Sequence, residues 1–255
     1  MFDLTLVGRA LVDQRRYEEL SNLIERCFAR SSVYRDLTSA RECLDVISRL
    51  GGDAPPAHGQ EDQAGEDLGI QVNALLAQAI LLYIRATDGV DRARSKKGSI
   101  LKAYCQDQRR SHERLLSLRN KVIAHFGTEG EQLWNRERMV VMVGADGMWQ
   151  YTHAFSRVTY HAATIDDLNS VLSLATQTVY ESLRSEEARV NELVQAATIG
   201  DGEFRSLMLA HQFDPISFFG DNSVAKSFGM EDHPEDVTVA RNVWTTAKGG
   251  DEDKN

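Results

Sequence analysis

The chain has 255 residues, of which 42% are hydrophobic and 26% are charged, and its formal net charge is −9. This composition is typical of a globular protein with one large domain, or one domain with an appendage. The acidic balance disfavours a protein that coats nucleic acid over its whole surface. The first residues show no signal peptide, and no run reaches the roughly 18 apolar residues of a membrane span. We therefore expect a soluble, cytoplasmic protein that does not contact a membrane.

The N-terminal segment, residues 1–52, shows two helical patterns that we expect to pack on the main bundle or to continue it. Apolar residues recur at spacings of three and four over residues 10–29 and again over residues 41–50. Ser39 and Glu42 have the spacing of a capping box, which marks the start of the second helix.

Residues 53–67 contain two adjacent prolines and five acidic residues, which predicts a flexible loop. A strongly apolar helix is expected over residues 68–87, and its wide apolar surface indicates burial on much of its circumference. Helical pattern resumes at about Ser99 and continues toward His125. Its polar middle leaves open whether this stretch forms one helix or two.

The hydrophobic period then changes to one that favours strands. Two β-favouring runs, Arg138–Val143 and Met148–His153, flank a hairpin turn signal at residues 145–147. A third run, Arg157–Tyr160, can extend the pair to three strands. We expect a small hairpin or three-stranded insertion over about residues 137–162.

A long helix, capped by Thr164 and running to about Ala197, is expected to complete a core that spans residues 68–200. A C-terminal extension follows over residues 201–230. Residues 231–255 are acidic and polar, which predicts a disordered tail.

The cysteine and histidine residues do not show the spacing of a metal-binding site. No Cys/His cluster has the spacing of a zinc site. We therefore expect the cysteines to be reduced core residues, and we expect no residue to bind a metal ion. His112 is expected on the surface, and His153 and His161 are expected to be structural. The three cysteines are Cys27, Cys43 and Cys105.

Positive charge is concentrated in one window. From Asp91 to Lys121 there are ten basic and three acidic residues, a net charge of +7, which leaves −16 for the rest of the chain. Such runs are usually solvated helix faces. This run, however, leads directly into the segment with the strongest chemical pattern.

That segment contains Arg119 and His125, separated by five residues, with Asn120 beside the arginine. It resembles the Arg-x(4–6)-His motif of the HEPN superfamily, and Arg-Asn-Lys-x-x-Ala-His is similar to the form found in abortive-infection HEPN proteins. A second match, Arg205 to His211, lacks the asparagine and follows no basic helix, so we interpret it as accidental.

The resemblance covers about residues 68–197 and implies a mainly α fold, an HEPN-like antiparallel helical bundle with a small β insertion. It also implies a homodimer with a composite active site, which cuts RNA without a metal or other cofactor, and a toxin-like or antiphage defence role. Arg119 is then the phosphate clamp, His125 the general acid or base, and Asn120 an orienting group.

Two further expectations concern geometry and substrate. A six-residue step in one straight helix would place Arg119 and His125 about 120° apart and roughly 9 Å apart along the axis. Either the long arginine side chain reaches partly round the helix, or the helix breaks or begins within the motif. The basic window is expected to bind the RNA backbone. The expected RNA-binding residues are Lys96, Lys97, Lys102, Arg109, Arg110, Arg114 and Lys121.

Two alternatives stay open. The chain can be a non-catalytic helical module for dimerisation or RNA binding, with a structural motif at Arg119. It can also be an enzyme held in check by an antitoxin or sensor protein, which docks on the apolar segment Phe213–Phe219 or on the acidic tail.

Overall fold

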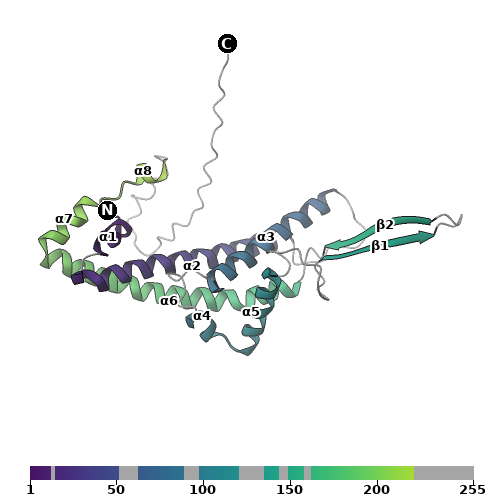
Figure 1. Cartoon of the computed structure of the whole chain (residues 1–255), viewed down its shortest axis with the longest axis horizontal. Coiled ribbons are helices and arrows are strands. Elements are labelled where there is room, and N and C mark those ends of the chain that lie inside the picture. The colour runs from purple at the N-terminus through teal and green to yellow at the C-terminus, as the bar shows by residue number, and fades with distance from the viewer. Residues whose placement is uncertain are drawn as a thin grey trace, which may run out of the picture.

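The structure is a computed structural model of the chain. It describes residues 1–12, 15–51, 63–88, 98–120, 135–143, 149–157 and 162–220. The described part is mainly helical, which confirms the expected fold class at this level. Two long helices, α2 (Glu18–Arg49) and α6 (Ala162–Gly200), lie side by side and set the long axis of the molecule (Figure 1).

The main core lies where helix α3 (Gln63–Asp88) packs against α2, with the N-terminal half of α6 completing it. The apolar residues of each helix recur every three or four positions, so each helix turns one face toward the others. The most deeply buried members include Leu37, Ile47, Leu76, Ile80, Tyr83, Leu168 and Leu172.

A second apolar cluster lies at the other end of the long helices. Here α1 (Leu4–Leu11) and α7 (Gly202–Ala210) pack around the start of α2 and the end of α6. The 3-10 turn η1 (Arg15–Tyr17) leads into α2, and the short helix α8 (Pro215–Phe219) follows α7. Figure 1 shows α1, α7 and α8 together at this end.

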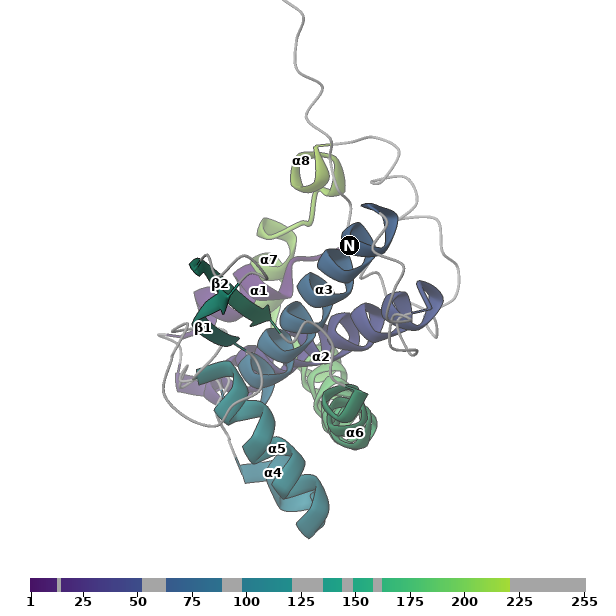
Figure 2. The same ribbon diagram turned by 90° about the vertical axis from the view of Figure 1, so that its right-hand side faces the viewer.

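The described part of the basic window, residues 98–120, contains two helices rather than one. Helix α4 (Gly98–Ala103) is separated from α5 (Gln106–Leu118) by Tyr104 and Cys105, and Figure 2 shows the two helices together on one side of the bundle. Both helices contact α6. Buried residues of α5, such as Leu115 and Leu118, join the main core.

Strands β1 (Asn135–Val143) and β2 (Trp149–Arg157) form a two-stranded antiparallel hairpin, in which Val141 pairs with Tyr151. The hairpin projects from the bundle along the long axis (Figure 1). The side chains of Val141, Trp149 and Tyr151 are exposed. Of the third expected strand, residues 158–160 lie outside the described residues.

Helix α3 is unusually apolar along much of its length. Over Asp67–Asp88 it is long and apolar enough to cross a membrane, by length and composition alone, and the core helix of a water-soluble protein meets the same criteria. In this structure Val72, Leu76 and Ile80 of α3 are buried in the main core.

Several expected boundaries were wrong. Residues 10–29 and 41–50 are not two helices, because α1 ends at Leu11 and α2 runs unbroken to Arg49. Residues 30–40 contain no glycine or proline, and Val33, Leu37 and Ala40 continue the apolar spacing. Ser39 and Glu42 therefore lie inside a helix instead of capping one.

Two further helix starts differ from expectation. Residues 63–67, expected to belong to the flexible loop, form the first turn of α3, whereas residues 52–62 lie outside the described residues. Thr164 does not cap α6, which begins at Ala162 and buries the threonine in its first turn. In both helices the regular spacing of apolar residues begins after the helical backbone has started. A prediction based on that spacing therefore places the first residue of the helix too late in the sequence.

Candidate active site

Of the three expected catalytic residues, Arg119 and Asn120 lie in the described part of the chain, whereas His125 lies outside it. Regular α-helix α5 ends at Leu118, and the backbone continues through Arg119 and Asn120 as a wider π-type turn. Both side chains are exposed, and Arg119 Nη1 donates a hydrogen bond to Asn120 Oδ1 at 2.8 Å. The two residues therefore form one solvent-facing polar pair.

The path of the chain from Arg119 to His125 lies only partly in the described residues. Arg119 keeps helical backbone angles (φ −56°, ψ −47°), and residues 121–125 lie outside the described part, so the angle of about 120° calculated for one straight helix stays an expectation. Arg119 is exposed, and no described residue engages its Nε or Nη2. A planar guanidinium group is suited to bind a phosphate group.

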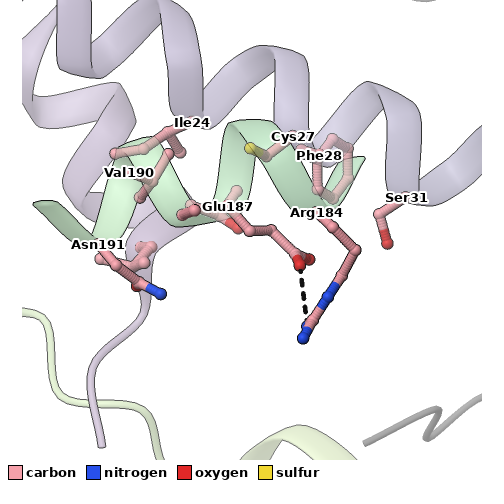
Figure 3. A pocket seen from close by; sticks show the side chains of 11 residues that line it. Ile24, Cys27, Phe28, Ser31, Arg184, Glu187, Val190 and Asn191 are labelled. Atoms are coloured by element: carbon pink, nitrogen blue, oxygen red, sulfur yellow. Dashed lines mark ion pairs between the residues drawn. The ribbon is translucent and has the colours of Figure 1, made fainter. Parts of the chain in front are cut away.

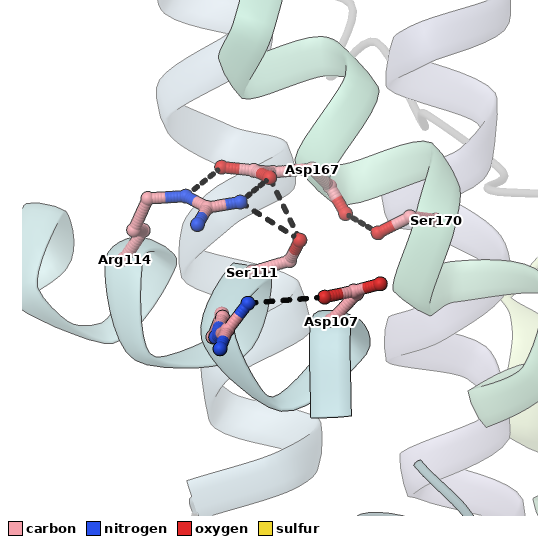
Figure 4. A network of polar contacts seen from close by, with 6 residues as sticks. Asp107, Ser111, Arg114, Asp167 and Ser170 are labelled. Atoms are coloured by element: carbon pink, nitrogen blue, oxygen red, sulfur yellow. Dashed lines mark hydrogen bonds and ion pairs between the residues drawn. The ribbon is translucent and has the colours of Figure 1, made fainter. Parts of the chain in front are cut away.

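Helix α5 is held on α6 by a polar network centred on Asp167 (Figure 4). The Asp167 carboxylate accepts hydrogen bonds from Ser111 Oγ at 2.7 Å, from Arg114 Nε at 2.8 Å and from Arg114 Nη2. At the start of α5, Gln108 Nε2 donates to the Ser170 carbonyl at 2.9 Å. These bonds fix the helix that carries Arg119.

The expected RNA-binding residues fall into four groups. Lys102 and Arg109 are exposed, and Arg109 Nε donates to the Tyr104 carbonyl at 3.1 Å. Arg110 is exposed and forms an ion pair with Asp107 at 3.3 Å. Arg114 is bonded to Asp167, which gives it a structural role whatever else it binds. Lys96, Lys97 and Lys121 lie outside the described residues.

His112 is not on the surface, and that prediction was wrong. Its side chain is buried on the inner face of α5, where Nδ1 lies 2.9 Å from the hydroxyl of Tyr83. The Tyr83 hydroxyl lies 3.2 Å from that of Tyr104, which donates to the Val171 carbonyl at 3.3 Å. Sequence reasoning missed this chain of contacts, although two tyrosines in apolar patterns each need a partner for the hydroxyl when buried.

Burial governs the ionisation of all three rings. It lowers the pKa of His112 below its usual value, because the charged imidazolium loses solvation, and the nearby carboxylates of Asp88 and Glu113 oppose this effect. Burial raises the pKa of Tyr104 to about 12 and raises that of Tyr83 further, and the Tyr83 and Tyr104 rings also interact with each other. At neutral pH all three rings are uncharged.

A hollow of about 530 Å³ lies between α2 and α6 near α1, away from Arg119 and Asn120 (Figure 3). Cys27, Phe28, Arg184 and Glu187 line it, and Arg184 pairs with Glu187 at 3.5 Å. Burial, followed in size by the nearby Glu186 and Glu187 carboxylates, raises the pKa of Cys27 to about 11. The thiol is therefore protonated at neutral pH and is a poor nucleophile.

The second match to the motif, Arg205 to His211, lies at the end of the bundle formed by α6 and α7, where Arg205 makes local contacts. Arg205 on α7 donates from Nε and Nη2 to the Thr198 carbonyl, at 3.2 and 2.9 Å. His211 lies at the C-terminal cap of the same helix. The arginine thus closes the turn between α6 and α7.

The three cysteines differ in their exposure to solvent. Cys27 and Cys43 are half-buried, but Cys105 is exposed at the start of α5, so its assignment to the core was wrong. It sits in the break between two short helices, where the chain passes over the surface. Within the described ranges no group of three His, Cys, Asp or Glu side chains is placed to hold a metal ion.

Comparisons with protein-family models, with curated proteins and with solved structures found no match to this chain.

Proposed function

We propose that the chain is a metal-independent endoribonuclease of the HEPN type, with Arg119, Asn120 and His125 as its catalytic group. The observation that carries the proposal is the exposed Arg119–Asn120 pair, joined by a 2.8 Å hydrogen bond at the π-type turn that ends α5. Single π-type turns in helices are frequent at functional sites. The pair stands beside the basic residues of α5, on a helix fixed to α6 through Asp167.

The proposed reaction uses the RNA's own 2′-hydroxyl as nucleophile. A base removes the hydroxyl proton, the 2′ oxygen bonds to phosphorus, and the P–O5′ bond breaks as an acid protonates the leaving oxygen. His125 supplies one of these proton transfers, because imidazole titrates near neutral pH. Arg119 stabilises the negative charge that develops on the phosphorane. The products are a 2′,3′-cyclic phosphate and a 5′-hydroxyl end.

Asn120 acts in this proposal as a positioning residue for Arg119. Its Oδ1 accepts from Nη1 and so restricts the orientation of the guanidinium. Nε and Nη2 are left for two phosphate oxygens, the bidentate geometry that arginine favours. Replacing Asn120 by aspartate would keep the acceptor but add a negative charge that competes with the phosphate.

The wider proposal includes the assembly and the biological setting. We propose an HEPN-like bundle that forms a cytoplasmic homodimer, in which the motifs of both copies face one cleft, and that serves toxin-like antiphage defence under the control of a partner protein. The segment Phe213–Phe219 is suited to such a partner, because Phe218 is exposed beside the rings of Phe213 and Phe219.

A second candidate function is a non-catalytic dimerisation module, and the hairpin favours it. An isolated two-stranded hairpin is only marginally stable in water and needs an added strand or a packed face. Here Trp149 and Tyr151 are 67% and 65% exposed, and among described residues β1 and β2 pack mainly on each other. A second copy of the chain could cover these residues. Trp149→Ala with Tyr151→Ala would then give a monomer by sedimentation velocity.

The proposal is tested by cleavage of a mixed RNA pool in excess EDTA with purified wild type, Arg119→Ala and His125→Ala. Cleavage by the wild type alone is expected. Asn120→Asp provides a graded variant, which should lose much but not all of the rate while keeping the fold. Equal cleavage by all proteins would place the activity elsewhere or in a contaminant. If none cleaves while all are folded, the dimerisation module is the better explanation.

A further inference from the structure

A second hollow, of about 340 Å³, lies between α4 and α5. It is lined by Leu101, Lys102, Arg109, His112 and Glu113. We propose that this hollow binds a phosphodiester of the RNA backbone, with His112 Nε2, Lys102 and Arg109 as donors. This inference rests on the proposed function for the identity of the ligand, but it adds a new site and a new residue, His112, that the cleavage chemistry does not use.

The orientation of His112 is fixed by its buried contacts. Only 7% of the residue is exposed, and its Nδ1 is occupied by the Tyr83 hydroxyl at 2.9 Å. Nε2 is therefore the nitrogen that remains for the hollow, and no described residue forms a hydrogen bond with it. A buried histidine with one nitrogen anchored and the other open to a hollow is a preorganised ligand contact.

The two tyrosines allow the open nitrogen to act as a donor. When Tyr104 donates to Tyr83, and Tyr83 donates to Nδ1, the neutral imidazole carries its proton on Nε2. Only the contact from Tyr104 to the Val171 carbonyl is lost, and at 3.3 Å it is the longest in the chain of contacts. An oxyanion in the hollow would select this arrangement, because it needs a donor.

Charge favours a singly charged phosphate. Lys102 and Arg109 contribute two positive charges to the lining and Glu113 contributes one negative charge, so the net charge is +1. A phosphodiester carries one negative charge and matches this lining, whereas a terminal phosphate carries close to two at pH 7. Arg109 is also well placed, because Nε is anchored on the Tyr104 carbonyl at 3.1 Å while no described residue engages its Nη atoms.

The hollow is also aligned with the proposed catalytic arginine. His112 precedes Arg119 by seven residues, about two helical turns, so the two lie roughly 10 Å apart along the helix direction, with His112 lining the hollow and Arg119 exposed at the end of α5. An RNA strand that follows α5 would thus meet the hollow and Arg119 in succession. The hollow would fix where along the strand the reacting phosphate sits.

The test is the affinity of the full chain for a 2′-O-methyl oligonucleotide, measured by fluorescence anisotropy at pH 8. This probe lacks the attacking hydroxyl, so binding is measured independently of cleavage. We expect Lys102→Gln and Arg109→Gln each to weaken binding about five- to tenfold and to reduce the salt slope by about 0.7. His112→Leu should weaken binding similarly without changing the slope, because neutral His112 releases no counterion. Arg9→Gln, on α1 at the far end of the bundle, is the matched control.

The pH dependence gives a second readout. Wild-type affinity should rise between pH 8 and pH 6, because an anion in the hollow stabilises protonated His112, and the rise should be smaller in His112→Leu, with any remainder removed by the additional change His125→Ala. The other groups near the ring are Tyr83 and Asp88 from α3, Tyr104 between the helices, Lys102 from α4, and Arg109 and Glu113 from α5.

The outcomes separate the inference from the proposed function. Loss of affinity in the three hollow variants, but not in Arg9→Gln, supports the site whether or not the wild type cuts RNA. Unchanged affinity in folded Lys102→Gln and Arg109→Gln overturns it, even if Arg119-dependent cleavage is present. An added 5′-phosphate should leave affinity unchanged. A tenfold gain that Arg109→Gln abolishes would identify a phosphomonoester site and overturn the assignment to backbone phosphodiester.

Discussion

Arg114 and Arg110 offer a matched test of whether a cation on α5 serves the fold or the surface. Their side chains are equally exposed, at 59% and 60%, but Arg114 binds Asp167, which is 14% exposed, whereas Arg110 pairs with Asp107, which is 89% exposed. Among the residues that the structure describes, truncation of Arg114 leaves the Asp167 carboxylate with Ser111 as its side-chain partner. A lost hydrogen bond to a charged group costs about 1.5–3 kcal/mol, which solvent screening reduces here to about 1–1.5 kcal/mol.

The expected loss of melting temperature for Arg114→Ala is therefore about 2–6 °C, at roughly 2–4 °C per kcal/mol for a domain of this size. Arg110→Ala removes an exposed pair at 3.3 Å, worth at most about 0.5 kcal/mol, and should shift the melting temperature by less than about 2 °C. Differential scanning calorimetry of both variants at pH 7 measures the difference. Equal losses would refute the assignment of α5–α6 anchoring to Asp167.

Two other changes probe the packing and ionisation of the interior. The pKa of His112 is lower in the folded chain than the unfolded value near 6.5, so the unfolded state binds more protons and stability should fall as pH drops through 6.5. Urea titrations from pH 7.5 to pH 5 should show a smaller loss in His112→Leu, and an identical loss would contradict burial of the ring. Gly8→Ala would place a Cβ 2.9 Å from Ile24 Cγ2 and should destabilise by about 1–3 kcal/mol. In Gly69→Ala the added Cβ meets no atom within 4 Å, and this variant should be stabilised by about 0.5–1 kcal/mol. If both variants changed the free energy of unfolding in the same direction, the close approach of α1 to α2 would be refuted.

The periodic apolar helices could be predicted from the sequence, because burial of one face leaves a regular mark. Leu76 and Ile80 belong to the apolar helix expected over residues 68–87, Leu168 and Leu172 belong to the long helix expected after Thr164, and all four lie in the main core. Helix ends were harder to place. Polar first turns such as residues 63–67 carry no apolar mark, and the Ser39–Glu42 pair has a capping-box spacing within a continuous helix.

The candidate site shows a different limit. Local sequence identifies Arg119 and Asn120, because both belong to one short motif, and the structure joins them by a hydrogen bond. It does not identify the role of His112, which depends on Tyr83 from α3 and on Tyr104, residues 29 and 8 positions away. A histidine among Arg109, Arg110 and Arg114 has the sequence neighbours of a surface residue, and its partners meet only in three dimensions.

The proposed reaction is metal-independent attack by the RNA 2′-hydroxyl. Its most direct test is mass spectrometry of the products from two RNA oligonucleotides, identical except for one 2′-deoxy nucleotide 5′ to the preferred cut, in excess EDTA. We expect the all-ribose strand to yield a 2′,3′-cyclic phosphate and a 5′-hydroxyl end, and the deoxy strand to stay intact at that position. Cleavage at the deoxy position, or products with 3′-hydroxyl and 5′-phosphate ends, would contradict the claim.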